Sequence, residues 1–390
     1  MSTIRELDLL LQGFVDKGLP GCGLEVRQRG NVIYEGYFGY ADCEAQTKIS
    51  RHSVFRQASL SKIPLYTTAM ILYEQGKFLL SDPLWQYLPE WRHCRKYILH
   101  PNGSVTIKET DRPLTIQDVL SMKCGLPYCN SDVSTEDLTL ASMQENMQPL
   151  WEKGHYTLQE EIKAMSKAIQ AFEPGIHWLY GFSSELVAGL IEVICEKSID
   201  DVFKSLLFEP LEMRSTGSHF FGDISERLVK LYQKDENGLM SPGPSWFDKK
   251  HLPGEENQRG WARLFSTVND YGNLLEMLAN GGLFQNRTIL GRKTIDLMRC
   301  NGLNTDQLMD FQDTYNAGYG YGLGVRTLIQ PEKGNHNGSL GAFGWTGGFG
   351  TWAEADPSEG LSIVYMHNQI PNEELYVHHR VRTAVYGLIE

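Results

Sequence analysis

The sequence predicts an α+β fold, in which one antiparallel sheet is flanked by helices and a helical lobe is inserted between the two ends of the chain. Strand-like alternation occurs near both ends, whereas helical periodicity dominates residues 114–211. No internal repeat, low-complexity tract or long linker divides the chain. We therefore expect a single unit over residues 1–390, with an α/β lobe at about 1–95 and 265–390 and an all-helical lobe at about 96–264.

A surface helix and a hairpin are expected at the N-terminus. In the first residues, Leu9, Leu10, Phe14 and Val15 recur at helical spacing. Further on, alternating apolar residues stand on both sides of a turn at Arg29-Gly30-Asn31, which is typical of two paired strands.

Helices are expected next at 59–76, 158–172 and 185–197. Alternation returns near the C-terminus, where residues 350–355 and 361–366 are predicted to form another hairpin. Because strands come from both chain ends, we expect them to share one sheet.

The charge balance argues against nucleic acid as a main partner. The 390 residues include 36 Lys and Arg against 48 Asp and Glu, which gives a formal net charge of −12, and the basic residues are scattered. No apolar stretch reaches the roughly 18 residues of a membrane-spanning helix, and the first residues lack the pattern of a secretory signal peptide. Neither nucleic acid nor a membrane is therefore expected as a partner, and the oligomeric state stays open.

Seven cysteines form an odd set without a CxxC pair, so we expect free thiols in a reducing, cytoplasmic environment. The sequence contains no HExxH, P-loop or zinc-spaced Cys/His cluster, and no metal or organic cofactor is expected. His378 and His379 are adjacent and lack the i, i+4 spacing of a helical metal pair, so we expect them to be plain surface residues.

The first positive signal is an SxxK motif, formed by Ser59 and Lys62 at the start of an apolar helix. The i, i+3 spacing places both side chains on one helical face, where the lysine can relay the hydroxyl proton. Alone the motif is weak, because on the order of one SxxK arises by chance in a chain of this length.

Two later segments strengthen the interpretation of Ser59 and Lys62 as a catalytic pair. Tyr180 follows a Pro-Gly turn and precedes an apolar helix, and a phenol held near Lys62 can act as a base toward Ser59. The run Trp345-Thr346-Gly347-Gly348 stands at the front of a predicted strand, where small residues let a substrate approach the backbone.

The three motifs, in this order, resemble the serine β-lactamase-related family, which includes class C β-lactamases, D,D-peptidases, family VIII carboxylesterases and acyltransferases. The likeness extends over nearly the whole chain. Further similar stretches are LSDPLWQYLPEW, TIQDVLSMKCGLP, FEPLEMRSTGSHF, GWARLFSTVNDYGNLLEMLANGG and FGTWAEADPSEGLSIVYMHN. The resemblance implies an antiparallel sheet with flanking helices, an all-helical lobe, and a site in the cleft between them.

The resemblance also implies residue roles. Ser59 is expected to be the acylated nucleophile, Lys62 its proton-relay partner, and Tyr180 the general base of acylation and the acid toward the leaving group. The family's oxyanion hole uses two backbone amides, which here correspond to those of Ser59 and Gly348. Losing one such donor typically costs about 2.7–4 kcal/mol of transition-state stabilisation.

Two departures from the family pattern bear on the substrate. Phe182 stands where β-lactamases usually carry Asn or Ser, and Trp345 stands where they carry the Lys of KTG. Both changes favour a neutral, apolar substrate over an anionic β-lactam. We expect Phe182, Trp345, Thr346 and Gly347 to bind the substrate, and lactam turnover to be weak.

Other residues are less informative. Met122-Lys123-Cys124 replaces a His-Thr-Ser common in relatives, a change without a chemical explanation in the sequence. Cys124 is expected to be a buried structural thiol because its neighbours are apolar. The segment 130–170 fits either a wall or lid that shapes the substrate site, or a solvated helical face.

The sequence thus predicts a serine hydrolase that acts on small, neutral or apolar esters through an acyl-enzyme, with a small molecule as its substrate. An amidase or peptidase for D-amino-acid substrates, or an acyltransferase, would use the same machinery. A binding protein that has kept the fold and lost turnover is the third alternative, against which the joint presence of Ser59, Lys62 and Tyr180 argues.

Overall fold

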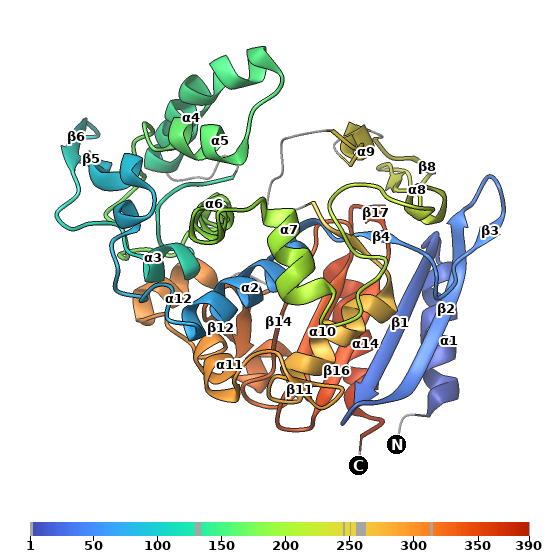
Figure 1. The fold of residues 1–390 in the computed structure, drawn as a ribbon. Helices are drawn as coiled ribbons and strands as arrows, with labels where there is room; N and C mark the ends of the chain where they lie inside the picture. Colours follow the sequence, from blue (N-terminus) through green and yellow to red (C-terminus); the bar gives the residue numbers. More distant parts are fainter. Residues whose placement is uncertain are drawn as a thin grey trace.

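The computed structural model describes residues 3–128, 134–244, 246–249, 251–254, 263–312 and 315–389. Its main feature is an antiparallel sheet of eight strands, drawn in blue for the N-terminal strands and in orange to red for the C-terminal strands in Figure 1. Their order across the sheet is β12 (Tyr319–Tyr321), β13 (Arg326–Leu328), β14 (Phe343–Thr346), β15 (Trp352–Asp356), β16 (Leu361–Met366), β1 (Gly21–Gln28), β2 (Asn31–Asp42) and β3 (Thr47–Lys48). The predicted α+β fold class is confirmed.

The two chain ends meet in the middle of this sheet. Strand β1 pairs with β16, which places Leu24 opposite Tyr365 and Val26 opposite Ile363. Both predicted hairpins are present, β1–β2 around Gly30 and β15–β16 around Pro357. Because apolar side chains of paired strands share a face, the two ends of the chain bury one another.

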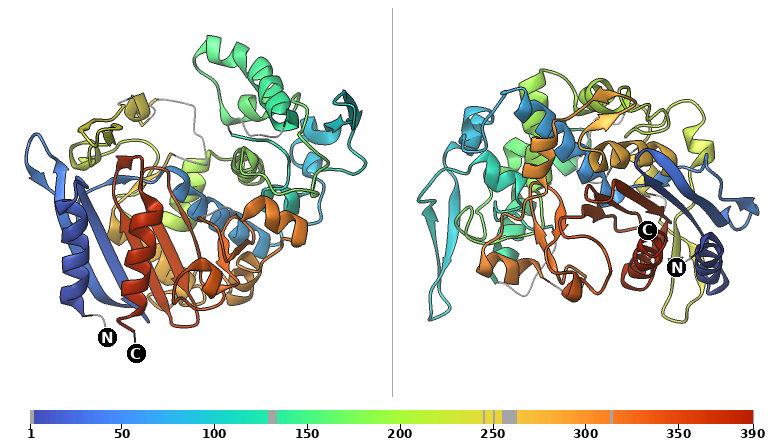
Figure 2. Two further views of the ribbon diagram at one scale, coloured as in Figure 1. Left: turned by 180° about the vertical axis from the view of Figure 1, so that it is seen from behind. Right: turned by 90° about the horizontal axis from the view of Figure 1, so that it is seen from below.

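One face of the sheet is covered by α1 (Ile4–Asp16) and α14 (Glu374–Tyr386), which lie side by side in Figure 2. Helix α1 begins at a capping box of Thr3 and Glu6. It buries Leu7, Leu11 and Phe14, whereas Leu9 of the predicted apolar stripe is 63% exposed. The predicted helix is therefore correct, although its buried face is turned away from Leu9.

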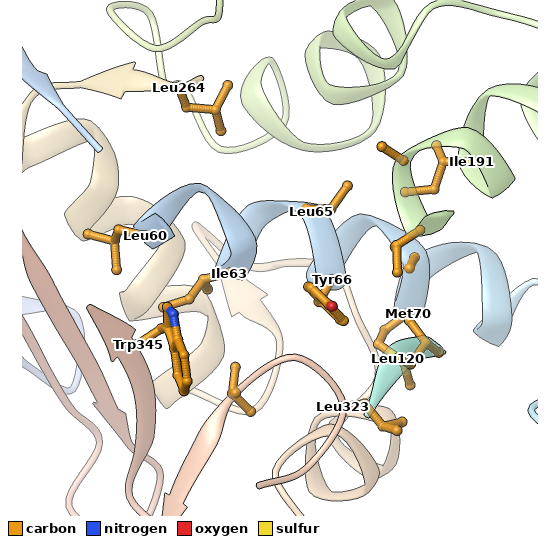
Figure 3. Packing of buried hydrophobic residues seen from close by; sticks show 14 of the residues in the cluster. Leu60, Ile63, Leu65, Tyr66, Met70, Leu120, Ile191, Leu264, Leu323 and Trp345 are labelled. Atoms are coloured by element: carbon orange, nitrogen blue, oxygen red, sulfur yellow. The ribbon is translucent and has the colours of Figure 1, made fainter. Parts of the chain in front are cut away.

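The opposite face is covered by α10 (Val268–Ala279), which packs on β1, β15 and β16. Next to it, α2 (Lys62–Glu74) lies in the large core and is buried over almost its whole length. Figure 3 shows this core around α2, with Leu60, Ile63 and Trp345 in the same cluster. Helix α2 thus links the sheet to the helices beyond it.

The helical region between the chain ends packs on α2. It contains α3 (Ile116–Leu120), α4 (Ser134–Lys153), α5 (Leu158–Met165), α6 (Ser183–Cys195), α7 (Ile199–Phe203) and the π-helix η4 (Lys204–Phe208). Helix α5 is shorter than the predicted 158–172 helix, because Gln170 pairs with the backbone of Arg95 and Tyr97. A hairpin of β5 (Arg95–Leu99) and β6 (Val105–Glu109), which the sequence analysis did not predict, also lies here.

The remaining elements are short. They are β4 (Phe55–Arg56), η1 (Ala58–Ser61), η2 (Leu84–Gln86), η3 (Pro89–Arg92), α8 (Ile224–Arg227), β7 (Tyr232–Lys234), β8 (Met240–Pro242), α9 (Trp246–Lys249), β9 (Phe265–Ser266), β10 (Leu283–Phe284), β11 (Arg287–Thr288), α11 (Arg292–Met298), α12 (Thr305–Phe311), α13 (Pro331–Gly334) and β17 (Gln369–Ile370). Within the described ranges, no helix combines the length and the apolar character needed to cross a bilayer.

Buried histidines make stability depend on pH. Burial lowers the pKa of His251 to about 4, while its Nδ1 donates a hydrogen bond to the carbonyl of Ser218 at 2.7 Å. In an unfolded chain a histidine has a pKa near 6.5. Between pH 6.5 and 4 the unfolded state therefore binds a proton that the folded state does not, and the free energy of unfolding falls as the pH falls.

We expect this histidine to contribute on the order of 2 kcal/mol to the loss of stability between pH 7 and pH 5. The variant His251→Asn keeps a donor for Ser218 but removes the titrating ring. Urea unfolding at pH 7, 6 and 5 should show a flatter pH dependence for this variant than for the parent. Equal pH dependence in both proteins would contradict the assignment.

Candidate active site

The proposed nucleophile lies on a strained turn. Ser59 is in the 3₁₀ turn η1 that leads into α2, and its side chain is partly exposed. The preceding Ala58 has a φ of +46°, in the left-handed region that costs a non-glycine residue roughly 1–2 kcal/mol. The turn is held from outside, since Tyr271 donates to the Leu60 carbonyl at 2.8 Å and the Gln57 amide donates to the Leu264 carbonyl at 2.9 Å.

Lys62 is the first residue of α2, and its side chain is fully buried. Its Nζ donates a hydrogen bond to Ser59 Oγ at 3.3 Å, so the helical spacing does bring the SxxK pair together. The same Nζ lies 4.7 Å from the ring centroid of Tyr180 and 5.2 Å from that of Tyr128. The amino group therefore lies among aromatic rings inside the protein core.

Tyr180 reaches this point through a segment that runs against the loop after α3. The Leu179 amide donates to the Met122 carbonyl, and the Phe182 amide donates to the Leu126 carbonyl, both at 2.9 Å. Any side chain at Gly181 would collide with the Leu126 carbonyl oxygen. Gly181, between Tyr180 and Phe182, is therefore required by this close backbone contact.

The third motif, at residues 345–348, lies directly against the turn that carries Ser59. A Cβ atom at Gly347 would collide with the carbonyl oxygen of Gln57, two residues before Ser59. The hydroxyl of Thr351 donates to that same carbonyl at 2.9 Å. The Gly350 amide donates to the Gly347 carbonyl at 2.9 Å and closes a turn that exposes Gly348.

Two amides are open to a ligand at this place. In the part of the chain that the structure describes, the Gly348 amide has no hydrogen-bond partner, and the Ser59 amide has none outside its own helical turn. These are the two amides predicted for the oxyanion hole. Thr346 is engaged differently, because its hydroxyl donates to Glu374 Oε2 at 2.9 Å.

Aromatic rings form one wall of the site. The indole Nε1 of Trp345 donates to the Tyr180 hydroxyl at 3.3 Å, and the two ring centroids are 5.6 Å apart. Phe182 packs edge-on against Tyr128 at 4.7 Å, and Tyr128 against Tyr180 at 5.3 Å. The predicted residues Phe182 and Trp345 are therefore joined through the rings of Tyr128 and Tyr180.

Tyr128 was missed by the sequence analysis. Burial raises its pKa well above the usual value, so the phenol stays neutral. It follows Gly125-Leu126-Pro127, the loop that contacts the Tyr180 segment. One feature of the sequence did point to this loop, because the unexplained change at Met122-Lys123-Cys124 lies in the same loop as Tyr128.

The remaining sequence-based expectations have mixed outcomes. Cys124 is fully buried with its sulfur 2.7 Å from Ser183 Oγ, and burial raises its pKa to about 12, as expected of a structural thiol. The expectation of surface residues at 378–379 is wrong for His378, which is fully buried because α14 packs that side against the sheet. Within the described residues, no three His, Cys, Asp or Glu side chains gather as a metal site.

The segment 130–170 is only partly described, since residues 130–133 lie outside the described residues. From Ser134 on, it forms α4 and α5, which pack on each other. Met143 and Met147 are buried between these elements and the core. Its effect on a substrate stays a prediction.

The fold and the sequence motifs define a hydrolase of the serine β-lactamase fold. The family model described as Beta-lactamase matches residues 7–387, and the chain belongs to this family.

Individual relatives are distant. The chain is 25% identical over 371 residues to Protein Rv1367c of Mycobacterium tuberculosis, covering 91% of this chain and 87% of that protein. It is 22% identical over 384 residues to Esterase EstB of Burkholderia gladioli, covering 94% and 91%. Among solved structures, it is similar to EstCE1, a hydrolase with promiscuous acyltransferase activity, at a TM-score of 0.80 and 23% identity over 98% of both chains.

The close approach at Gly347 leads to a prediction with a matched control. Gly347→Ala should lower the thermal midpoint by several degrees, because overpacking costs about 1–3 kcal/mol. It should also slow fluorophosphonate labelling at least about 10-fold, since the turn carrying Gly348 is pushed away from Ser59. Gly348→Ala should leave the midpoint unchanged, because a Cβ there meets no atom within 4 Å. Equal destabilisation of both variants would contradict the packing account.

Proposed function

We propose that the protein is a carboxylesterase-like serine hydrolase, which acts on small, neutral or apolar esters through an acyl-enzyme on Ser59. The observation that carries the proposal is the hydrogen bond from Trp345 Nε1 to the Tyr180 hydroxyl. At the position where β-lactamases carry a lysine, this chain places an uncharged indole, and the single polar hydrogen of that indole is directed at the proposed base.

The substrate preference follows from charge and desolvation. An anionic substrate loses an ion pair when tryptophan replaces lysine, and its carboxylate would have to be desolvated beside aromatic rings. A neutral ester has no ion pair to lose and no carboxylate to desolvate. The rings of Tyr128, Tyr180, Phe182 and Trp345 offer apolar and aromatic surface, which is the usual lining of a site for an uncharged small molecule.

In the proposed acylation step, the coupled Lys62–Tyr180 pair reacts in the state that carries one proton fewer than ammonium plus phenol. Ser59 Oγ attacks the ester carbonyl carbon while its proton passes to this pair. The Trp345 indole fixes the direction of the Tyr180 hydroxyl. The carbonyl oxygen becomes negatively charged and accepts hydrogen bonds from the amides of Ser59 and Gly348. The ester C–O bond then breaks, the alkoxide takes the proton back from the pair, and the alcohol leaves.

Deacylation repeats these steps with water as the nucleophile, which releases the carboxylic acid and restores Ser59. An alcohol that binds against the aromatic wall would accept the acyl group in place of water. The second candidate function is therefore acyl transfer, which the similarity to EstCE1 supports at the level of the fold.

We also propose a reducing, cytoplasmic environment for the protein. It is supported by the cysteines among the described residues, all of which are unpaired thiols.

Labelling of Ser59 tests the proposed reaction. The parent should release nitrophenol from short-chain p-nitrophenyl esters and gain the mass of one fluorophosphonate on the peptide that carries Ser59. Ser59→Ala should lose at least about 10³-fold in kcat and take up no label, because the acyl acceptor is gone. As a control, Ser205→Ala alters an exposed serine and should behave like the parent. Turnover or labelling that survives Ser59→Ala would refute the proposal.

Two replacements of Trp345 separate its two roles. Trp345→Lys should shift relative kcat/KM by about 10-fold or more from an apolar ester toward an ester that bears a carboxylate on its acyl group, because the new ammonium pairs with it. Trp345→Phe keeps an apolar ring but loses the donor to Tyr180, so kcat should fall several-fold while the selectivity stays as in the parent. Unchanged selectivity in the lysine variant would contradict the proposed substrate class.

A further inference from the structure

The turn that carries Gly348 is supported from behind by a buried histidine. His378 of α14 is fully buried, and its Nε2 lies 3.1 Å from the carbonyl oxygen of Gly350. Gly350 has a φ of +101°, and a Cβ atom there would collide with the ring of His367. Gly350 is thus enclosed between two imidazoles, one on its carbonyl and one against its α-carbon.

The hydrogen bonds around His378 have a fixed direction. A carbonyl oxygen only accepts, so Nε2 of His378 must carry the proton that Gly350 receives. Burial, then the neighbouring His367 and Arg382, lower the pKa of His378 well below its usual value, so the ring is neutral and Nδ1 accepts. The partner of Nδ1 is the Tyr315 hydroxyl at 2.9 Å, which must therefore donate.

Tyr315 is oriented in turn by a buried arginine. Arg326 Nη2 donates to the Tyr315 oxygen at 3.0 Å, and the guanidinium lies 4.3 Å from the Tyr315 ring centroid. The result is a one-way relay from Arg326 on β13, through Tyr315 and His378, to the Gly350 carbonyl. Because arginine does not deprotonate in proteins, the relay cannot reverse its direction.

This relay ends on the turn that the proposed reaction uses. The amide of Gly350 donates to the Gly347 carbonyl, so the two hydrogen bonds at Gly350 fix the turn in which Gly348 lies. We propose that His378 is a positioning residue, which holds the 347–350 turn so that the Gly348 amide points to the place where negative charge develops. This inference rests on the proposed function, since the charge in question is that of the acyl-transfer transition state.

The expected effects follow from displacing one oxyanion donor. His378→Leu should lower kcat for a p-nitrophenyl ester about 10–100-fold with little change in KM, because the donor acts on the transition state. His378→Gln offers an amide N–H at the position of Nε2 and should recover most of the activity. Tyr315→Phe removes the donor that fixes the tautomer and should lie between these two variants.

His251→Leu is the matched control, since His251 is also buried and also donates to a backbone carbonyl, that of Ser218 in another loop. It should lower the thermal midpoint as His378→Leu does but leave kcat of the folded protein unchanged. A fall in kcat of the same size in both variants would show a general loss of packing and would overturn the proposal.

A second measurement separates this inference from the proposed function. Hydrogen–deuterium exchange of the peptide spanning residues 345–351 should accelerate in His378→Leu and keep the parent rate in His378→Gln and His251→Leu. Failure of the parent to turn over any ester or to be labelled would defeat the proposed function, while the exchange rates would still test the support of the turn. Parent-like exchange and parent-like kcat in His378→Leu would overturn the inference.

Discussion

The carbonyl of Gln57 accepts the Thr351 hydroxyl and lies so close to Gly347 that no side chain fits between them. This contact joins the end of β14 to the turn at the start of α2, two parts of the chain almost 300 residues apart. The distance between Ser59 and the Gly348 amide is therefore set by backbone packing, which flexes little. The side chains that surround the site, from Lys62 to Trp345, act within a frame that this contact determines.

That frame is itself made by pairing the two ends of the chain in one sheet. Strand β1 lies between β2 and β16, and α1 and α14 close the same face. On that face, His378 extends the support of the frame from α14 to the Gly350 carbonyl. The site is thus stabilised from two sides, by the helical core through α2 and by the C-terminal helix through the 347–350 turn.

Much of this could be predicted from the sequence, because the relevant patterns are local. The i, i+3 spacing of Ser59 and Lys62 is sufficient to place them together on a helical turn, and alternating apolar residues are sufficient to place β1 and β2. The hairpin β5–β6 was missed because such a local pattern is lacking there. Strand β6 is largely solvent-exposed, and the buried residue of β5 is Lys96, so neither strand shows the apolar alternation of a half-buried strand.

Tertiary burial accounts for the other errors. Tyr128 becomes part of the site only because its loop contacts the segment around Tyr180, some fifty residues away. His378 was expected at the surface. Nothing in its neighbours along the chain indicates that its side chain points from α14 to the turn at Gly350. Contacts of this kind depend on where whole elements pack, which residue spacing does not encode.

The most direct test of the account is a crystal structure of the protein after reaction with a fluorophosphonate. We predict a phosphonyl group on Ser59 Oγ whose oxygen lies about 2.7–3.1 Å from both the Ser59 and the Gly348 amide nitrogens, with its apolar substituent against Trp345. A phosphonyl oxygen directed to solvent, or a label on a residue other than Ser59, would contradict it.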